Sequence, residues 1–282
     1  MPDVITKEQI QAFYTDGYLV VKGGYPIDEL LKIRGIFDKA FAEELWKKSA
    51  FDTNEILSDI YLHFPDILNV IFSEKVINTL KDILGENLIC IPECAVHRNR
   101  YINWHRDTTR MEKLGEKIHI GKDKMLIQCA VYFQDNNEEG GGLTIVPGSH
   151  IRKDRFVKMY SPNLLHRVVY KMAKLVNASP FTAIEENDNP VNILSEIGDM
   201  VLFNSQADHR STFALDRKGK PIISKTEKFA IFNCFTNDME LARRYRDSDK
   251  NANEPYANFL KQSTINQSLV NRARELNIRL CH

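Results

Sequence analysis

The feature that most constrains the fold is a change in hydrophobic period near Gly85. Before this residue, apolar residues recur at the spacing of amphipathic helices in IDELLKIRGIFDKAFAEELWKK and SEKVINTLKDIL. After it come short β-prone runs separated by Asn, Asp, Gly and Pro: LICIPECAV, KMLIQCAVYF, LTIV, DMVLF and KFAIFNCF. Strands that follow one another without helical repeats favour an antiparallel sandwich or barrel over a parallel α/β sheet.

The organisation of the chain follows from this change. Thr6 and Gln9 stand at capping-box spacing and predict a short helix, and the run GYLVV predicts a strand after it. We expect one domain, 1–282, with a helical part over about 1–85, a β core over 86–236 and a polar, partly helical tail over 237–282. Two long connections interrupt the core, and we expect them to cover the mouth of a pocket: 108–124 and 151–190.

Composition excludes several classes of partner. Thirty-eight basic residues balance 38 acidic ones, so no strong positive field favours nucleic acid. The five cysteines are an odd number without a CxxC pair, which is typical of free thiols in a reducing compartment. No apolar run approaches the roughly 18 residues of a membrane span, and the N-terminus lacks a signal-peptide pattern. We therefore expect a cytoplasmic protein without a membrane partner; the oligomeric state is open.

The stretch NWHRDTTR contains a candidate metal motif, His105-Arg106-Asp107. On an extended strand, residues two apart point to the same face, so His105 and Asp107 could reach one ion. Arg106 is expected to point to the other face and to take no part. His209 follows the β-prone run GDMVLFNSQAD and could complete two histidines and a carboxylate, the facial triad of non-heme Fe(II) oxygenases. The HxD spacing alone is also compatible with a polar surface loop.

Two further segments accompany this motif, GGGLTIVPGSH at 140–150 and GDMVLFNSQADHRST at 198–212. With HxD and the opening ITKEQIQAFYTDGYLVV, they resemble the phytanoyl-CoA dioxygenase family of Fe(II)- and 2-oxoglutarate-dependent oxygenases, from near residue 5 to about residue 236. The resemblance implies a mainly β fold with flanking helices, in which N-terminal helices pack outside a double-stranded β-helix (jelly roll). It implies His105, Asp107 and His209 as iron ligands, with 2-oxoglutarate and O2 as cosubstrates.

The resemblance also indicates where 2-oxoglutarate would bind. Ser211, two residues after His209, matches a position that commonly contacts it, and Gln128 is a candidate on a β-prone run. The family usually has an arginine at the start of the last core strand, where this chain has Lys228. Lysine supplies the charge without a bidentate fork. We favour Lys228 as the anchor over Arg217 and Lys225, the alternative being a solvated cation at a strand end.

The remaining candidates concern the substrate and the reaction. Side chains on or near these runs could contact a substrate: His97, Arg98, Arg100, Trp104 and Tyr132. Related radical halogenases have a small residue in place of the carboxylate, so Asp107 favours hydroxylation. We expect hydroxylation of a small organic molecule, with 2-oxoglutarate and O2 converted to succinate and CO2. Two alternatives stay open: desaturation, epoxidation or cyclisation at the same iron site, and a non-catalytic metal-binding sensor or binding protein.

Overall fold

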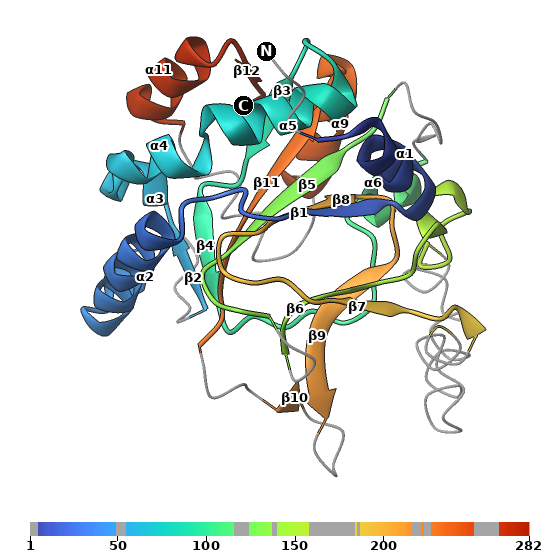
Figure 1. The fold of residues 1–282 in the computed structure, drawn as a ribbon, viewed down its shortest axis with the longest axis horizontal. Helices are drawn as coiled ribbons and strands as arrows, with labels where there is room; N and C mark the ends of the chain where they lie inside the picture. The colour runs from blue at the N-terminus through green and yellow to red at the C-terminus, as the bar shows by residue number, and fades with distance from the viewer. Residues whose placement is uncertain are drawn as a thin grey trace.

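Two β-sheets facing each other form the centre of the fold (Figure 1). The computed structural model describes residues 5–48, 55–115, 124–136, 140–157, 184, 187–215, 221–222, 227–250 and 265–281. The larger sheet has the order β1 (Tyr18–Val21), β8 (Met200–Asn204), β5 (Ile127–Tyr132), β11 (Phe229–Thr236), β3 (Ile89–Pro92), β12 (Arg279–Leu280), with β4 (Ala95–Arg98) pairing with β11 and with β2 (Ile56–Ser58). The smaller sheet has the order β10 (Pro221–Ile222), β9 (His209–Leu215), β6 (Gly140–Ile145), β7 (Val191–Ile193).

Helices cover the outer face of the larger sheet, as the period change predicts (Figure 1). This layer contains α1 (Lys7–Asp16), α2 (Ile27–Ala42), α3 (Ile60–His63), α4 (Leu68–Ile71), α5 (Glu74–Leu84) and α11 (Gln267–Glu275). The short 3-10 helices are η1 (Leu45–Lys48), η2 (Pro65–Ile67) and η3 (Ser149–Ile151). The helix expected over residues 27–48 therefore ends at Ala42 and resumes as η1.

Local signals at the N-terminus behave as the sequence predicts. The Gln9 amide donates to Thr6 Oγ1 at 3.3 Å, and the Thr6 amide donates to Gln9 Oε1 at 2.8 Å, which completes the capping box of α1. The helix ends at Gly17, whose φ of 83° lies in the left-handed region. A Cβ here would meet His150 Nδ1 at 2.5 Å, so the close approach of His150 also requires glycine.

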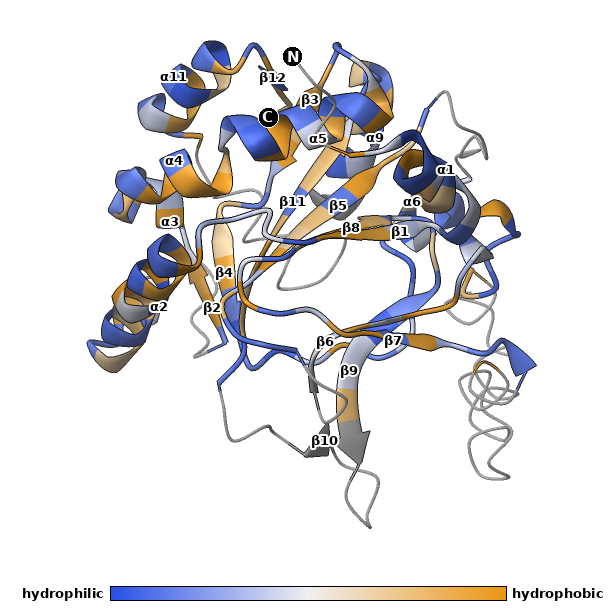
Figure 2. Cartoon of the chain, viewed as in Figure 1, coloured by the Kyte–Doolittle hydropathy of each residue, from blue (hydrophilic) through white to orange (hydrophobic). Residues whose placement is uncertain are grey.

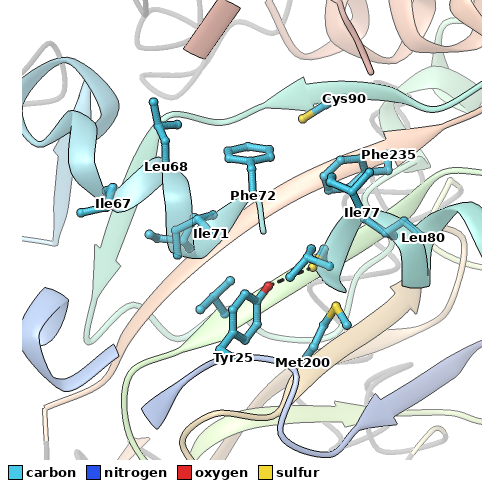
Figure 3. Packing of buried hydrophobic residues seen from close by; sticks show 14 of the residues in the cluster. Tyr25, Ile67, Leu68, Ile71, Phe72, Ile77, Leu80, Cys90, Met200 and Phe235 are labelled. Atoms are coloured by element: carbon cyan, nitrogen blue, oxygen red, sulfur yellow. Dashed lines mark hydrogen bonds between the residues drawn. The ribbon is translucent and has the colours of Figure 1, made fainter. Parts of the chain in front are cut away.

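The main hydrophobic core lies between these helices and the larger sheet. The central strands carry mostly apolar residues, and α2 turns its apolar side inward (Figure 2). In Figure 3, Ile77 and Leu80 of α5 pack with Phe235 of β11 and Met200 of β8. The Tyr25 hydroxyl and Cys129 Sγ are 3.5 Å apart in this layer. This packed layer fixes β5, β8 and β11, whose opposite faces look toward the smaller sheet.

The inner face of the larger sheet is covered in two different ways. One part packs on the smaller sheet through residues such as Tyr132, Leu143, Ile145 and Phe203. The other part packs on α6 (Thr109–Lys113) and α9 (Met239–Lys250), through Met111, Leu126, Cys234, Leu241 and Tyr245. The C-terminal tail thus helps to close the inner face. A cavity of about 450 Å³ is lined by residues from both parts.

The sequence-based fold prediction is confirmed in its main features: a sheet-rich chain of jelly-roll architecture with helices packed outside. All five cysteines are free thiols, and all are buried. Within the described part of the chain, no helix combines the length and the apolar character that crossing a membrane requires. Most of 151–190 and the second half of 108–124 lie outside the described residues, so their expected role as covers stays a prediction.

Candidate metal centre

The structure brings His105, Asp107 and His209 together, with one ligand atom of each lying within 4.8 Å of the others. His209 begins β9, and His105 pairs with it in an isolated antiparallel bridge. The His105 amide donates to the His209 carbonyl at 2.9 Å, and the His209 amide donates to the His105 carbonyl at 3.0 Å. Asp107 lies just beyond this bridge, in a turn rather than on a strand, and its amide donates to the Ser205 carbonyl.

Both imidazoles present the nitrogen that a metal requires. His105 Nδ1 lies 2.7 Å from the Asn103 carbonyl oxygen, and His209 Nδ1 lies 2.9 Å from that of Ala207. A carbonyl only accepts hydrogen bonds, so each Nδ1 carries the proton and each Nε2 keeps a lone pair. Both Nε2 atoms are 3.6 Å from the same oxygen, Asp107 Oδ1. These three residues would hold a metal ion between them, since one ligand atom of each lies within 4.8 Å of the others.

Gln128 fixes the orientation of the carboxylate. Its Nε2 donates one hydrogen bond to Asp107 Oδ2 at 3.1 Å and another to the Tyr245 hydroxyl oxygen at 3.2 Å. Oδ2 is therefore engaged, and Oδ1 faces the two imidazoles. This contact links helix α9 to the acid through strand β5. The structure thus places Gln128, a candidate for 2-oxoglutarate, directly on the acid.

The electrostatics suit a divalent cation. Burial lowers the pKa of His209 to about 4, with the nearby His105 acting in the same direction, so His209 is neutral at pH 7. Burial alone would raise the pKa of Asp107, but the imidazoles of His209 and His105 and the Gln128 amide outweigh it and lower that pKa. Two imidazole nitrogens and one carboxylate form a donor set that fits Fe(II).

Lys228 lines the same cavity as the triad, at the residue before β11. Its side chain is 3 % exposed, and Nζ lies 5.2 Å from the centre of the Tyr101 ring and 5.8 Å from that of Tyr132. Its hydrogen bond to the Arg100 carbonyl is long, at 3.5 Å. In the part of the chain that the structure describes, Lys228 makes no ion pair with an acid. Burial lowers the pKa of Lys228 to about 7.

Several other predicted residues also line this cavity. Ser211 lies on β9, where its Oγ accepts a hydrogen bond from the Ile102 amide at 3.1 Å. Arg100 and Tyr132 contribute to the wall as well. His97 points into the cavity with its Nε2 2.9 Å from Glu93 Oε1, and its ring packs against Phe232.

Two predicted substrate-binding residues do not reach the cavity wall. Arg98 ion-pairs with Glu227, and its guanidinium lies 5.1 Å from the Phe41 ring centre. Trp104 is 1 % exposed and packs with Val146, Phe156 and Ile184. The alternative anchors Arg217 and Lys225 lie outside the described residues.

Arg106 is not one of the three ligand residues, but it is not a free surface residue either. Its guanidinium is buried in an ion pair with Asp208, the residue before His209. The alternation rule does hold at this point: Arg106 and Asp208 flank the bridged pair His105 and His209, so their side chains meet on the face opposite the ligands. Sequence reasoning also missed Tyr245 and Arg246 of α9, which line the cavity from a tail without a recognisable motif.

Comparisons with known proteins show a family match and similar relatives. The phytanoyl-CoA dioxygenase family matches residues 13–213 of the chain. An ectoine dioxygenase from Bordetella bronchiseptica is 25% identical over 168 residues, covering 52% of this chain and 50% of that protein. A second, from Bordetella parapertussis, matches to the same extent. The chain thus spans about half the length of the curated relatives it matches.

Solved structures show the same fold at low sequence identity. EctD from S. alaskensis, with 2-oxoglutarate and 5-hydroxyectoine, is 16% identical with a TM-score of 0.56, covering 83% of this chain and 77% of EctD. HygX from Streptomyces hygroscopicus, with nickel and 2-oxoglutarate, is 15% identical with a TM-score of 0.55, covering 82% and 86%. Because the family match extends over more than half of its length, the chain belongs to the phytanoyl-CoA dioxygenase family.

Proposed function

We propose that this protein is a non-heme Fe(II)- and 2-oxoglutarate-dependent dioxygenase that hydroxylates a small organic molecule. The observation that carries the proposal is the convergence of His105 Nε2, His209 Nε2 and Asp107 Oδ1 at the wall of a cavity. Three protein ligands leave coordination positions free for a chelating cosubstrate and for O2. Membership of the phytanoyl-CoA dioxygenase family supports the same assignment.

In this proposal the triad residues hold the iron. His105 and His209 supply neutral nitrogens whose orientation is set by hydrogen bonds from Nδ1 to backbone carbonyls. Asp107 supplies one carboxylate oxygen and offsets part of the charge of the ion, and Gln128 keeps its second oxygen engaged. Fe(II), when bound, supplies the open coordination sites at which O2 and the 2-oxo acid react.

Lys228 is the proposed anchor for the distal carboxylate of 2-oxoglutarate. A buried ammonium group beside two aromatic rings gains electrostatic energy when an anion enters the cavity. Ser211 lies on the same wall and is a further contact for the cosubstrate. His97, Arg100 and Tyr132 are candidate contacts for either ligand, because they line the same space.

The reaction class follows from Asp107. A carboxylate at this position occupies a site that a halogenase would leave open for halide, so the ligand set favours hydroxylation over halogenation. Desaturation, epoxidation and cyclisation use the same ligands and remain alternatives. The cavity of about 450 Å³ supports a small-molecule substrate rather than a macromolecule.

The test is an anaerobic titration of the metal-free protein with Fe(II), followed by 2-oxoglutarate. We expect a visible metal-to-ligand charge-transfer band, and succinate after O2 is admitted. A protein that binds iron but never develops the band would rule out the dioxygenase. A band without any succinate, even from slow uncoupled turnover, would instead support a non-catalytic sensor.

A further inference from the structure

The residues that flank the metal ligands form a buried ion pair. Arg106 Nε donates to Asp208 Oδ1, and the two side chains are 1% and 0% exposed. Arg106 stands between His105 and Asp107, and Asp208 precedes His209. One ion pair therefore connects the segments that carry all three ligands. The sequence gives no hint of it, because the two residues are 102 positions apart.

The remaining donors of Arg106 attach this pair to the loop after β6. Nη1 donates to the Arg152 carbonyl and Nη2 to the Ser149 carbonyl, both at 2.9 Å. Asp208 is held on the other side, since its amide donates to Ser149 Oγ at 2.8 Å and its carbonyl accepts from the Val146 amide at 2.9 Å. The guanidinium thus uses its planar fork to fix three groups at once.

A second arginine extends the network. Arg155 Nε lies 2.8 Å from Asp208 Oδ2, and its Nη1 lies 2.6 Å from Asp188 Oδ2. Arg152 also pairs with Asp188, at 3.0 Å. Residues 155 and 188 stand on opposite sides of the 158–183 interval in the sequence. The network therefore ties both flanks of that long connection to the residue next to His209.

Stability alone does not account for such a pair. A buried ion pair is often no more stabilising than apolar residues of the same volume, because desolvation offsets the attraction. What a forked pair does supply is fixed geometry. Here the backbone bridge between His105 and His209 fixes their separation, and the Arg106–Asp208 pair restrains rotation of the two segments about that bridge.

We propose that Arg106 and Asp208 are positioning residues that hold His105, Asp107 and His209 at metal-binding separation. The inference rests on the proposed iron site, but it concerns metal affinity and not the oxidation that follows. A purely structural role predicts that variants of Arg106 and Asp208 lose stability alone. The positioning role predicts that their Fe(II) affinity also falls, and by more than the loss of stability explains.

The test compares Fe(II) affinity, measured by anaerobic equilibrium dialysis, with thermal unfolding of the metal-free protein. Arg106→Lys keeps the charge but loses the fork, and Asp208→Asn keeps an acceptor but loses the charge. We expect each to weaken Fe(II) binding about ten- to a hundredfold, the range seen when groups that orient ligands are removed. Arg155→Lys should have a smaller effect in the same direction.

Arg34→Lys is the matched control. Arg34 is also largely buried, and its guanidinium donates to the carbonyls of Phe133 and Glu227, both at 2.9 Å, on the far side of the larger sheet. We expect a lower unfolding temperature and unchanged Fe(II) affinity. If Arg34→Lys weakened iron binding as much as Arg106→Lys, general destabilisation would explain the result and the inference would fail.

The double variant Arg106→Met/Asp208→Leu separates the two roles further. It leaves neither charge of this pair buried alone, so its unfolding temperature should exceed that of Asp208→Asn. Its Fe(II) affinity should stay weak. Wild-type affinity in the double variant would overturn the inference. If the wild-type protein itself bound no Fe(II), the proposed function would fail instead, so the two failures are distinguishable.

Discussion

Two parts of the cavity wall, which we call the triad end and the Lys228 end, handle charge in opposite ways. At the triad, an ionised carboxylate is surrounded by two imidazoles and an amide, and the pKa of Asp107 is lowered. At the other end, Lys228 faces two aromatic rings and one distant carbonyl, and burial lowers its pKa to about 7. One end stabilises its charge before any ligand arrives, whereas the other destabilises it.

This contrast indicates which end depends on a ligand. The triad geometry is held by hydrogen bonds that exist without a metal, so iron binding requires little rearrangement. The ammonium group of Lys228 has lost hydration without gaining an acid among the described residues. An entering carboxylate would supply the charge partner that offsets this loss. Variants at the two ends should therefore change different steps of ligand binding.

The largest effect is expected from His209→Ala, which removes one of three ligands. Fe(II) affinity should fall about a thousandfold or more, equivalent to about 4 kcal/mol, because two ligands cannot complete the facial set. Anaerobic calorimetric titration with Fe(II) measures it. His63→Ala, which changes a histidine outside the cavity, should bind iron as the wild type does. Wild-type affinity in His209→Ala would remove this residue from the site.

Lys228→Met should have the next largest effect, confined to the other end of the cavity. Iron binding should be unchanged, but the Kd for 2-oxoglutarate should rise about 30- to 1000-fold, since losing a buried charge partner costs about 2 to 4 kcal/mol. The metal-free variant should also unfold at a higher temperature at pH 6, because a desolvated cation has been removed.

Spectrophotometric titration of the iron-loaded protein with 2-oxoglutarate checks this prediction. Lys22→Met is the control, since the Lys22 side chain is 65% exposed. It should not alter the Kd. Normal 2-oxoglutarate binding by Lys228→Met would show that another group anchors the cosubstrate.

The residues at the two ends could be located from the sequence, because each stands in a recognisable local signal, but the difference in how they hold charge could not. His105 and Asp107 are two residues apart, His209 follows a β-prone run, and Lys228 immediately precedes the last core strand. The alternation rule also explains one failed expectation. On β4, His97 faces the cavity, so its neighbour Arg98 must face away, where it contacts Phe41.

The supporting contacts could not be predicted in the same way. Gln128 and Tyr245 are 117 positions apart, and nothing in the tail marks Tyr245 as part of the site. The strand rule turned Arg106 away from the ligands but could not identify Asp208 as its partner, because the bridge between His105 and His209 is a long-range contact. Such contacts depend on how segments pack in three dimensions, which local patterns do not specify.

Gln128→Leu should have an intermediate effect at the triad end. Without the amide, Asp107 Oδ2 loses its hydrogen bond and the carboxylate can rotate, so Fe(II) affinity should fall about ten- to a hundredfold. Anaerobic dialysis measures it. Gln134→Leu is the matched control: this buried amide bonds Asn136 and the Phe229 backbone and should affect stability alone. Equal iron affinity in both variants would show that the amide does not orient the acid.

The smallest expected effect is a pH dependence at the Lys228 end. Only the protonated amine attracts the distal carboxylate, and a pKa of about 7 means that this form is lost as the pH rises through 7 in the free protein. The Kd for 2-oxoglutarate should therefore rise by up to about tenfold per pH unit above 7. His209, with a pKa of about 4, does not titrate in this range.

The lowered pKa of Lys228 also determines how the stability of the metal-free protein changes with pH. The unfolded chain keeps the lysine protonated until about pH 10, whereas the folded chain releases the proton near pH 7. Unfolding then takes up a proton, so Lys228 contributes a rise in the stability of the metal-free protein between pH 7 and 10. Lys228→Met should abolish both this contribution and the pH dependence of the Kd. A wild-type Kd that is flat from pH 6.5 to 8.5 would mean that Lys228 stays charged despite its burial, which would make the two ends of the cavity alike.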